Sequence, residues 1–172
     1  LLIAVIGGRI IPSFTRNWLA GRKETRLPVP FGRGDAVVLA ISAVALGLWV
    51  VWPAQGLVAL VCAVAGLAQA WRLSRWQGGR TGTEPLVWVL HAAYAWIPVH
   101  LAFRAMASVG WISSSVANHA LTAGAIGGMV IGMMTRTARG HTGQPLRADR
   151  ADVTCYALVL TAALLRVLVP LA

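Results

Sequence analysis

Charge, acidic residues and cysteine are all scarce in this chain. Only 12% of its 172 residues are charged and five of them are acidic, whereas a soluble domain carries roughly 25% charged residues. Cys62 and Cys155 are predicted on different helices at different depths, so no disulfide is expected. The sequence also lacks GxSxG, P-loop, HExxH, CxxC and CxxCH motifs. These absences exclude a soluble hydrolase or kinase and covalent c-type haem.

Long uncharged runs take the place of the missing charge. Hydrophobic residues make up 58% of the chain and the mean hydropathy is +0.70. Ala36 to Trp71 contains no charged residue, and Pro53 to Gln55 divides it into two segments long enough to cross a bilayer. We therefore predict an all-α, polytopic integral membrane helix bundle, a single domain over residues 1–172. Its approximate helices, about six transmembrane segments, are 1–8, 35–53, 55–72, 85–107, 117–137 and 151–170.

The first residues do not look like a targeting signal. The chain begins inside an apolar run with no methionine, no basic region ahead of it and no small-residue cleavage site. We therefore expect it to be cut from a longer protein.

The charged residues fall on one side of the membrane once these helices are threaded back and forth. That side receives the loops 9–35, 72–80 and 136–150, which hold most of the arginines. All five acids fall on the same side: Glu24, Asp35, Glu84, Asp149 and Asp152. By the positive-inside rule these loops are cytoplasmic, which predicts a multi-pass membrane protein. The net charge of +10 is thus a topology signal. No nucleic-acid partner is expected, because the arginines are divided among short loops.

Arg104 and Arg166 do not follow this pattern. Each is predicted near the outer end of a helix, where a cation is costly unless it is paired or reaches the headgroups. Two interpretations stay open. Both side chains could extend to the outer headgroups, or both could pair with carboxylates of a bound cofactor such as haem propionates.

The four histidines divide between the two leaflets. His91 is predicted about 9 Å inside the cytoplasmic end of its helix, and His141 lies in the loop on the same side. His100 and His119 approach each other at the outer leaflet. His91 and His100 are nine residues apart, on opposite faces of one helix, and so cannot share a metal.

Each histidine is either a metal or haem ligand or a hydrogen-bond partner between helices. His119 is the stronger ligand candidate because Ala123, Gly127 and Val130 on its face are mostly small. The neighbouring stripe Ala120, Gly124, Gly128 and Gly132 predicts close helix packing. Tyr94 is one turn from His91 and is either a hydrogen-bond donor to it or an interfacial aromatic.

Three motifs in order resemble the NnrS family of bacterial membrane proteins. They are GRIIPSFT at 8–15, PLVWVLHAAYAW at 85–96, and the stretch 119–146 containing HALTAGAIGGM, MTRTARGHTG and QPL. The resemblance implies an inner-membrane protein of about twelve helices that contains haem and copper. It also implies a role in nitric oxide metabolism or resistance to nitrosative stress, alongside denitrification. This chain would be the C-terminal half, with the lipid bilayer and the missing N-terminal half as its partners.

Within that resemblance we assign provisional roles. His91 and His119 are expected as axial or copper ligands on facing helices, with His141 as a further cytoplasmic-side ligand, and His100 as a candidate outside the motifs. Arg104 and Arg166 would pair with the propionates of a b-type haem. The expected ligand is nitric oxide or a nitrosylated iron species, and whether the protein turns a substrate over stays open. The alternative function is a transporter or channel subunit without a metal.

Overall fold

The computed structural model describes residues 1–171, and every element in them is helical. This confirms the predicted all-α fold. The main helices are α1 (Leu2–Gly21), α2 (Arg33–Val51), α3 (Gly56–Ser74), α4 (Pro85–Ser108), α5 (Ser114–His119), α6 (Gly128–His141) and α7 (Arg150–Leu168). Short segments η1 (Gly78–Arg80) and η3 (Val169–Leu171) are 3₁₀, and η2 (Ala120–Gly127) is π-helical and continuous with α5 and α6.

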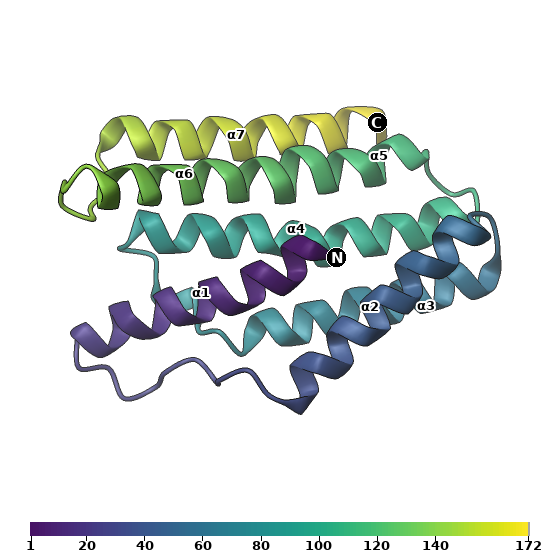
Figure 1. Ribbon diagram of the computed structural model, residues 1–172. Coiled ribbons are helices and arrows are strands. Elements are labelled where there is room, and N and C mark those ends of the chain that lie inside the picture. The colour runs from purple at the N-terminus through teal and green to yellow at the C-terminus, as the bar shows by residue number, and fades with distance from the viewer. Residues whose placement is uncertain (172) are drawn as a thin grey trace.

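Five helices in the described residues are long and apolar enough to cross a membrane. They are Arg33–Val51, Gly56–Arg80, Pro85–Ser108, Ser114–His141 and Arg150–Leu171. α4 lies in the middle of the bundle, with α6 and α7 on one side and α1, α2 and α3 on the other (Figure 1). It is also the most buried of the five. Side chains on α4 therefore meet every layer of the fold.

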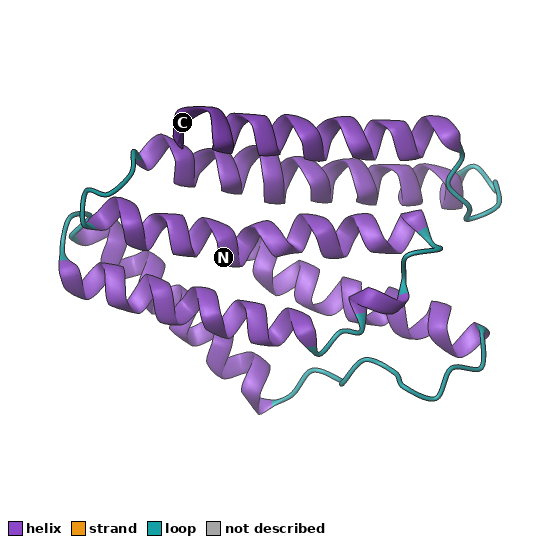
Figure 2. Ribbon diagram, turned by 180° about the vertical axis from the view of Figure 1, so that it is seen from behind, coloured by secondary structure: helices purple, strands orange, loops and turns teal. Residues whose placement is uncertain are grey.

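The connecting loops gather at two ends of the bundle, apart from a longer one that runs from α1 to α2 (Figure 2). We call the end that contains Gly21, Arg33, Ser74, Pro85 and His141 the basic end, and the other the neutral end. The helices start where the sequence offers suitable caps. Asp35 accepts a hydrogen bond from the backbone of Gly32, and Pro85 occupies the first turn of α4.

α1 is much longer than the predicted helix 1–8. It continues to Gly21, so Arg9 and Arg16 lie on a helix and not in a loop. Both arginines are exposed, while the buried residues recur every three or four positions: Ala4, Gly7, Gly8, Ile11, Thr15 and Leu19. This is the spacing of an amphipathic helix. The prediction was wrong here because the two arginines were taken as the end of an apolar span.

The small-residue stripe packs against α4, as predicted. A Cβ on Gly128 would lie 2.8 Å from the Cβ of Ala93, and one on Gly132 would lie 2.9 Å from side-chain atoms of Val89 and Leu90. These separations are shorter than carbon atoms tolerate, so glycine is required for the two helices to approach this closely. The contact fixes the position of α4 along α6.

Candidate functional site

A buried polar network joins four helices in the half of the bundle nearest the basic end. Its centre is Arg72 of α3, which is fully buried. Nε of Arg72 donates to Asp35 at 2.9 Å, and its Nη1 donates to the hydroxyl of Tyr94 and to the carbonyl of Ala4, each at 3.0 Å. The Tyr94 hydroxyl donates to Gln69 at 2.7 Å. The network therefore ties α1, α2, α3 and α4 together.

The observed positions of two of these residues differ from those predicted from the sequence. Arg72 was assigned to a cytoplasmic loop and Asp35 to the cytoplasmic surface, yet both are buried and paired. The acids are therefore not all at the surface. A signal for the pair was present, because Asp35 and Arg72 lie at nearly equal sequence distances from the turn at Pro53 and Ala54. A tight antiparallel hairpin brings such positions together.

His91 has one ring nitrogen in a hydrogen bond and one buried without a partner. Its side chain is 8% exposed, and its Nε2 lies 2.8 Å from the hydroxyl of Thr15 on α1. Trp76 meets the ring edge-on, with 6.4 Å between ring centroids. The other nitrogen, Nδ1, is buried and has no hydrogen-bond partner. A buried nitrogen with a free lone pair is the form of histidine that binds metals.

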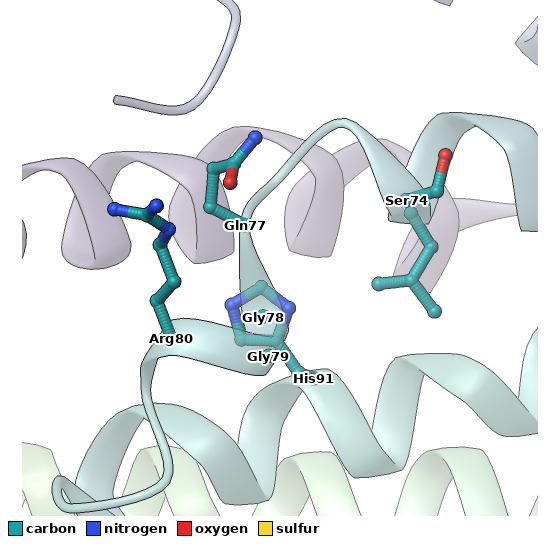
Figure 3. Close-up of a pocket in the computed structure, with 7 residues that line it drawn as sticks. Ser74, Gln77, Gly78, Gly79, Arg80 and His91 are labelled. Carbon is teal, nitrogen blue, oxygen red and sulfur yellow. The ribbon is translucent and has the colours of Figure 1, made fainter. Parts of the chain in front are cut away.

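A cavity of about 390 Å³ lies beside this ring. It is lined by Leu73, Ser74, Gln77, Gly78, Gly79, Arg80 and His91. Figure 3 shows the imidazole rising from α4 toward the turn at Gly78 and Gly79, with Gln77 and Arg80 to one side and Ser74 to the other. A Cβ on Gly78 would lie 2.7 Å from Nδ1 of His91. Only glycine at position 78 leaves room for the turn to pack this closely against the ring.

Tyr94 does not serve His91. Its hydroxyl is bonded to Gln69, Arg72 and Ala4, and its ring packs edge-on against Trp76 at 4.6 Å between centroids. It is fully buried, so it is not an interfacial aromatic either. The hydroxyl that does hold His91 belongs to Thr15, which the sequence did not single out.

His100 and Arg104 lie on α4 near the neutral end and contact α5. Nδ1 of His100 is 2.7 Å from the carbonyl oxygen of Ala117, and Arg104 donates to the side-chain oxygen of Asn118. The Arg104 guanidinium also stacks 4.1 Å from the centre of the Trp49 ring. Arg104 is 1% exposed. It therefore does not extend to the headgroups, contrary to one of the two interpretations of the sequence.

The remaining candidates are more accessible. His119 ends α5, is partly exposed and lies 3.3 Å from the Ser115 hydroxyl. His141 is exposed at the end of α6, beside a surface pocket that also involves Arg136. Arg166 is exposed on α7.

His100 contacts α5, the helix that ends at His119, whereas His91 lies away from both histidines. His91 and His100 are nine residues apart on α4, a rise of about 14 Å along a helix. Within residues 1–171, no group of three or more His, Cys, Asp or Glu side chains is arranged to hold a metal ion. A metal at His91 would therefore need further ligands from outside the described residues.

Comparison with known families identifies the chain. The profile described as NnrS protein matches residues 1–172. The chain belongs to the NnrS family. No curated protein and no solved structure matches it. Membership confirms the resemblance seen in the three motifs and makes this a membrane protein associated with nitric oxide metabolism.

The NnrS motifs meet in space at the His91 site. Thr15 is the last residue of GRIIPSFT on α1, and His91 lies within PLVWVLHAAYAW on α4. Their side chains are in contact although 76 residues separate them. The Gly128 and Gly132 contacts place the third motif on the other side of α4. Two of the three motifs thus contribute directly to the pocket or its support.

Proposed function

We propose that this chain is part of a haem- and copper-containing protein of the bacterial inner membrane that binds nitric oxide or nitrosylated iron species and so protects against nitrosative stress. Family membership supports the association with nitric oxide. The observation that carries the metal proposal is His91, with one ring nitrogen held by Thr15 and the other unpaired beside a cavity.

His91 would supply one ligand to a bound metal at this site. A metal-ligating histidine commonly donates its second ring N–H to an oxygen, which orients the ring, and Thr15 supplies that oxygen. When bound, a reduced metal would supply the centre to which nitric oxide attaches. The chain's own contribution is a buried imidazole that packs against Trp76, at the edge of a pocket whose lining includes Ser74, Gln77 and Arg80.

Haem is proposed with less direct support from side chains. The suggested propionate partners differ: Arg104 is already engaged by Asn118 and Trp49, whereas Arg166 is exposed. Arg104 still has a buried Nε without a partner. A haem carboxylate near α5 would satisfy that nitrogen. His100 and His119 are the nearest histidines in sequence and space to this part of the bundle.

The proposal is tested on the full-length protein purified in detergent. Absorbance spectra would be recorded oxidised, dithionite-reduced and with nitric oxide, together with iron and copper analysis. A Soret band that shifts with nitric oxide and stoichiometric copper are expected. His91→Gln should lower the metal content relative to the wild type. A protein that never carries haem or copper during gentle purification would refute the proposal.

A metal-free transporter is the second candidate, because charges buried within spanning helices often mark a transport path. The Asp35 and Arg72 pair is such a feature. Transport predicts substrate flux into proteoliposomes by a colourless protein, and flux should be lost in Asp35→Asn. Flux with no cofactor would favour this candidate over the first.

A further inference from the structure

An apolar groove follows the boundary between α1 and α6. Its volume is about 130 Å³, and every residue that lines it is Leu, Ile, Met or Gly. Ile6 and Ile10 line it from α1, and Met129 and Met133 line it from α6. Ile6 is 46% exposed, so the groove is open along this side of the bundle. Its lining suits a hydrocarbon chain and offers no partner to a polar group.

The groove continues into a polar pocket toward the basic end. Met133 lines both, and the pocket has a volume of about 330 Å³. Arg136, Thr137 and His141 of α6 line the pocket together with Phe14 of α1. The three α6 side chains carry N–H and O–H groups that can donate hydrogen bonds. We call the groove and the pocket together the α1–α6 groove.

The α1–α6 groove is about as long as one leaflet of a bilayer is deep. It runs along α1 from Leu2 to Phe14, a rise of about 18 Å. The hydrocarbon of one leaflet is roughly 15 Å deep, half of the whole apolar core. Both helices extend to the basic end, where the polar pocket lies (Figure 1). This order of apolar groove and polar pocket matches the acyl chain and headgroup of a phospholipid.

Arg136 is the cation at the polar end of the α1–α6 groove. Its guanidinium lies 3.9 Å from the centre of the Phe14 ring, and no ion pair joins it to a carboxylate in residues 1–171. Glu84 attracts it from the start of α4 but does not line the groove. Arg139, one turn later on α6, is instead paired with two carboxylates. Arg136 is therefore the arginine of this helix that is free to bind an anion.

We propose that the α1–α6 groove binds one anionic phospholipid, with an acyl chain between the two helices and the phosphate on Arg136. A guanidinium can bind a phosphate through two parallel N–H donors. No carboxylate lines the groove, so it offers no partner to the ammonium group of a zwitterionic headgroup. The groove shares no lining residue with the cavity at His91. The inference therefore does not depend on a bound metal.

Lipid binding is measured by native mass spectrometry on the full-length protein in detergent. The protein is titrated with phosphatidylglycerol and, separately, with phosphatidylethanolamine that has the same acyl chains. We expect one phosphatidylglycerol to bind about 5-fold more tightly, since one favourable charge contact at a membrane surface contributes about 1 kcal/mol. Equal binding of the two lipids would overturn the proposal.

Two pairs of variants locate the bound lipid. Arg136→Gln should weaken phosphatidylglycerol binding about 10-fold, the usual effect of losing a hydrogen bond to a charged group. Arg147→Gln, at an exposed arginine of the same end that does not line the groove, should leave it unchanged. Ile6→Trp fills the apolar part and should weaken binding by a similar factor, whereas Leu158→Trp, at an exposed leucine of α7, should not.

The remaining outcomes separate this lipid from other occupants. Equal losses in Arg136→Gln and Arg147→Gln would show only a general attraction to a basic protein and would overturn the proposal. Displacement of the lipid by inorganic phosphate would assign Arg136 to a free anion, and unchanged binding in Ile6→Trp would show that another segment covers the groove. Both results would also overturn it. Arg136→Lys keeps the charge without the paired donors and should retain part of the affinity. Unchanged unfolding in SDS shows that each variant folds.

Discussion

α4 carries two buried histidines whose ring nitrogens are used in opposite ways. Near the basic end, Nε2 of His91 is held by Thr15 of α1. Near the neutral end, Nδ1 of His100 must donate to the Ala117 carbonyl of α5, because a carbonyl only accepts. His91 therefore offers Nδ1 and His100 offers Nε2. Both side chains are less than 10% exposed, so burial does not distinguish them. The helix packed against each ring determines which nitrogen is free.

The charges beside the two histidines differ as well. Arg72, near His91, is paired with the carboxylate of Asp35. Arg104, near His100, is bonded to a neutral amide and stacked on an indole, and no carboxylate in residues 1–171 forms an ion pair with it. The buried cation near His91 thus has an anionic partner, whereas the buried cation near His100 has none in residues 1–171. Of these two buried sites, the one beside His100 more readily accommodates an anionic group.

The largest expected effect comes from breaking the ion pair at the basic half. Asp35→Asn leaves the Arg72 charge buried and unpaired, which should destabilise the protein by about 3–5 kcal/mol. Asn118→Ala, the corresponding change at Arg104, removes one hydrogen bond to a charge and should cost about 1.5–3 kcal/mol. Unfolding of the purified protein by SDS titration measures both.

A double variant tests whether the unpaired Arg72 charge causes the loss of stability in Asp35→Asn. Asp35→Leu combined with Arg72→Met removes both charges and should recover part of the lost stability, because no uncompensated ion remains. Equal losses in Asp35→Asn and Asn118→Ala would show that the two halves do not differ as described.

A smaller effect is expected from a change that displaces α4 between the two histidines. In Gly128→Ala the new methyl would lie 2.8 Å from the Cβ of Ala93, and such overpacking costs about 1–3 kcal/mol. The adjacent Gly127→Ala is the control, since its methyl would be in ordinary contact at 3.5 Å and 3.6 Å. It should change stability by less than about 0.5 kcal/mol.

Both histidine tautomers should survive Gly128→Ala if the displacement is small, because α1 and α5 hold the rings directly. Unfolding by SDS and the histidine ¹⁵N spectrum would be recorded together. A Gly127→Ala variant as unstable as Gly128→Ala would contradict the packing described for this helix pair.

The spans of this fold follow from the sequence, because lipid requires long uncharged helices and the runs are unbroken. The predicted helix 85–107 differs from the observed Pro85–Ser108 by one residue. The site was less predictable. His91 was chosen by residue type and depth, but its free nitrogen depends on Thr15, 76 positions away, and on the space left by Gly78. Such long-range contacts have no local pattern in the sequence.

The buried polar network around Arg72 could be predicted from the sequence only in part. The hairpin turn at Pro53 and Ala54 places Asp35 opposite Arg72, so that pair could have been read from the register of α2 and α3. The other partners could not be predicted, because Tyr94 comes from α4, and Ala4 comes from α1, where Gly8 leaves room for the guanidinium.

The smallest expected effect is at a charged residue outside the spans and away from both histidines. The backbone N–H of Asp152, which donates to Asp149, and the guanidinium of Arg139 hold the pKa of Asp149 below its usual value of 3.8. A lowered pKa means that the carboxylate stabilises the folded state above pH 3.8, and that this contribution is lost as the pH falls further. Asp149→Asn keeps a residue that caps helices well and removes only the charge. Its melting temperature should therefore lie slightly below that of the wild type near pH 7 and converge with it on acidification, while the His91 and His100 tautomers stay unchanged. Melting curves between pH 7 and pH 3 test this, and a gap that widens toward low pH would contradict it.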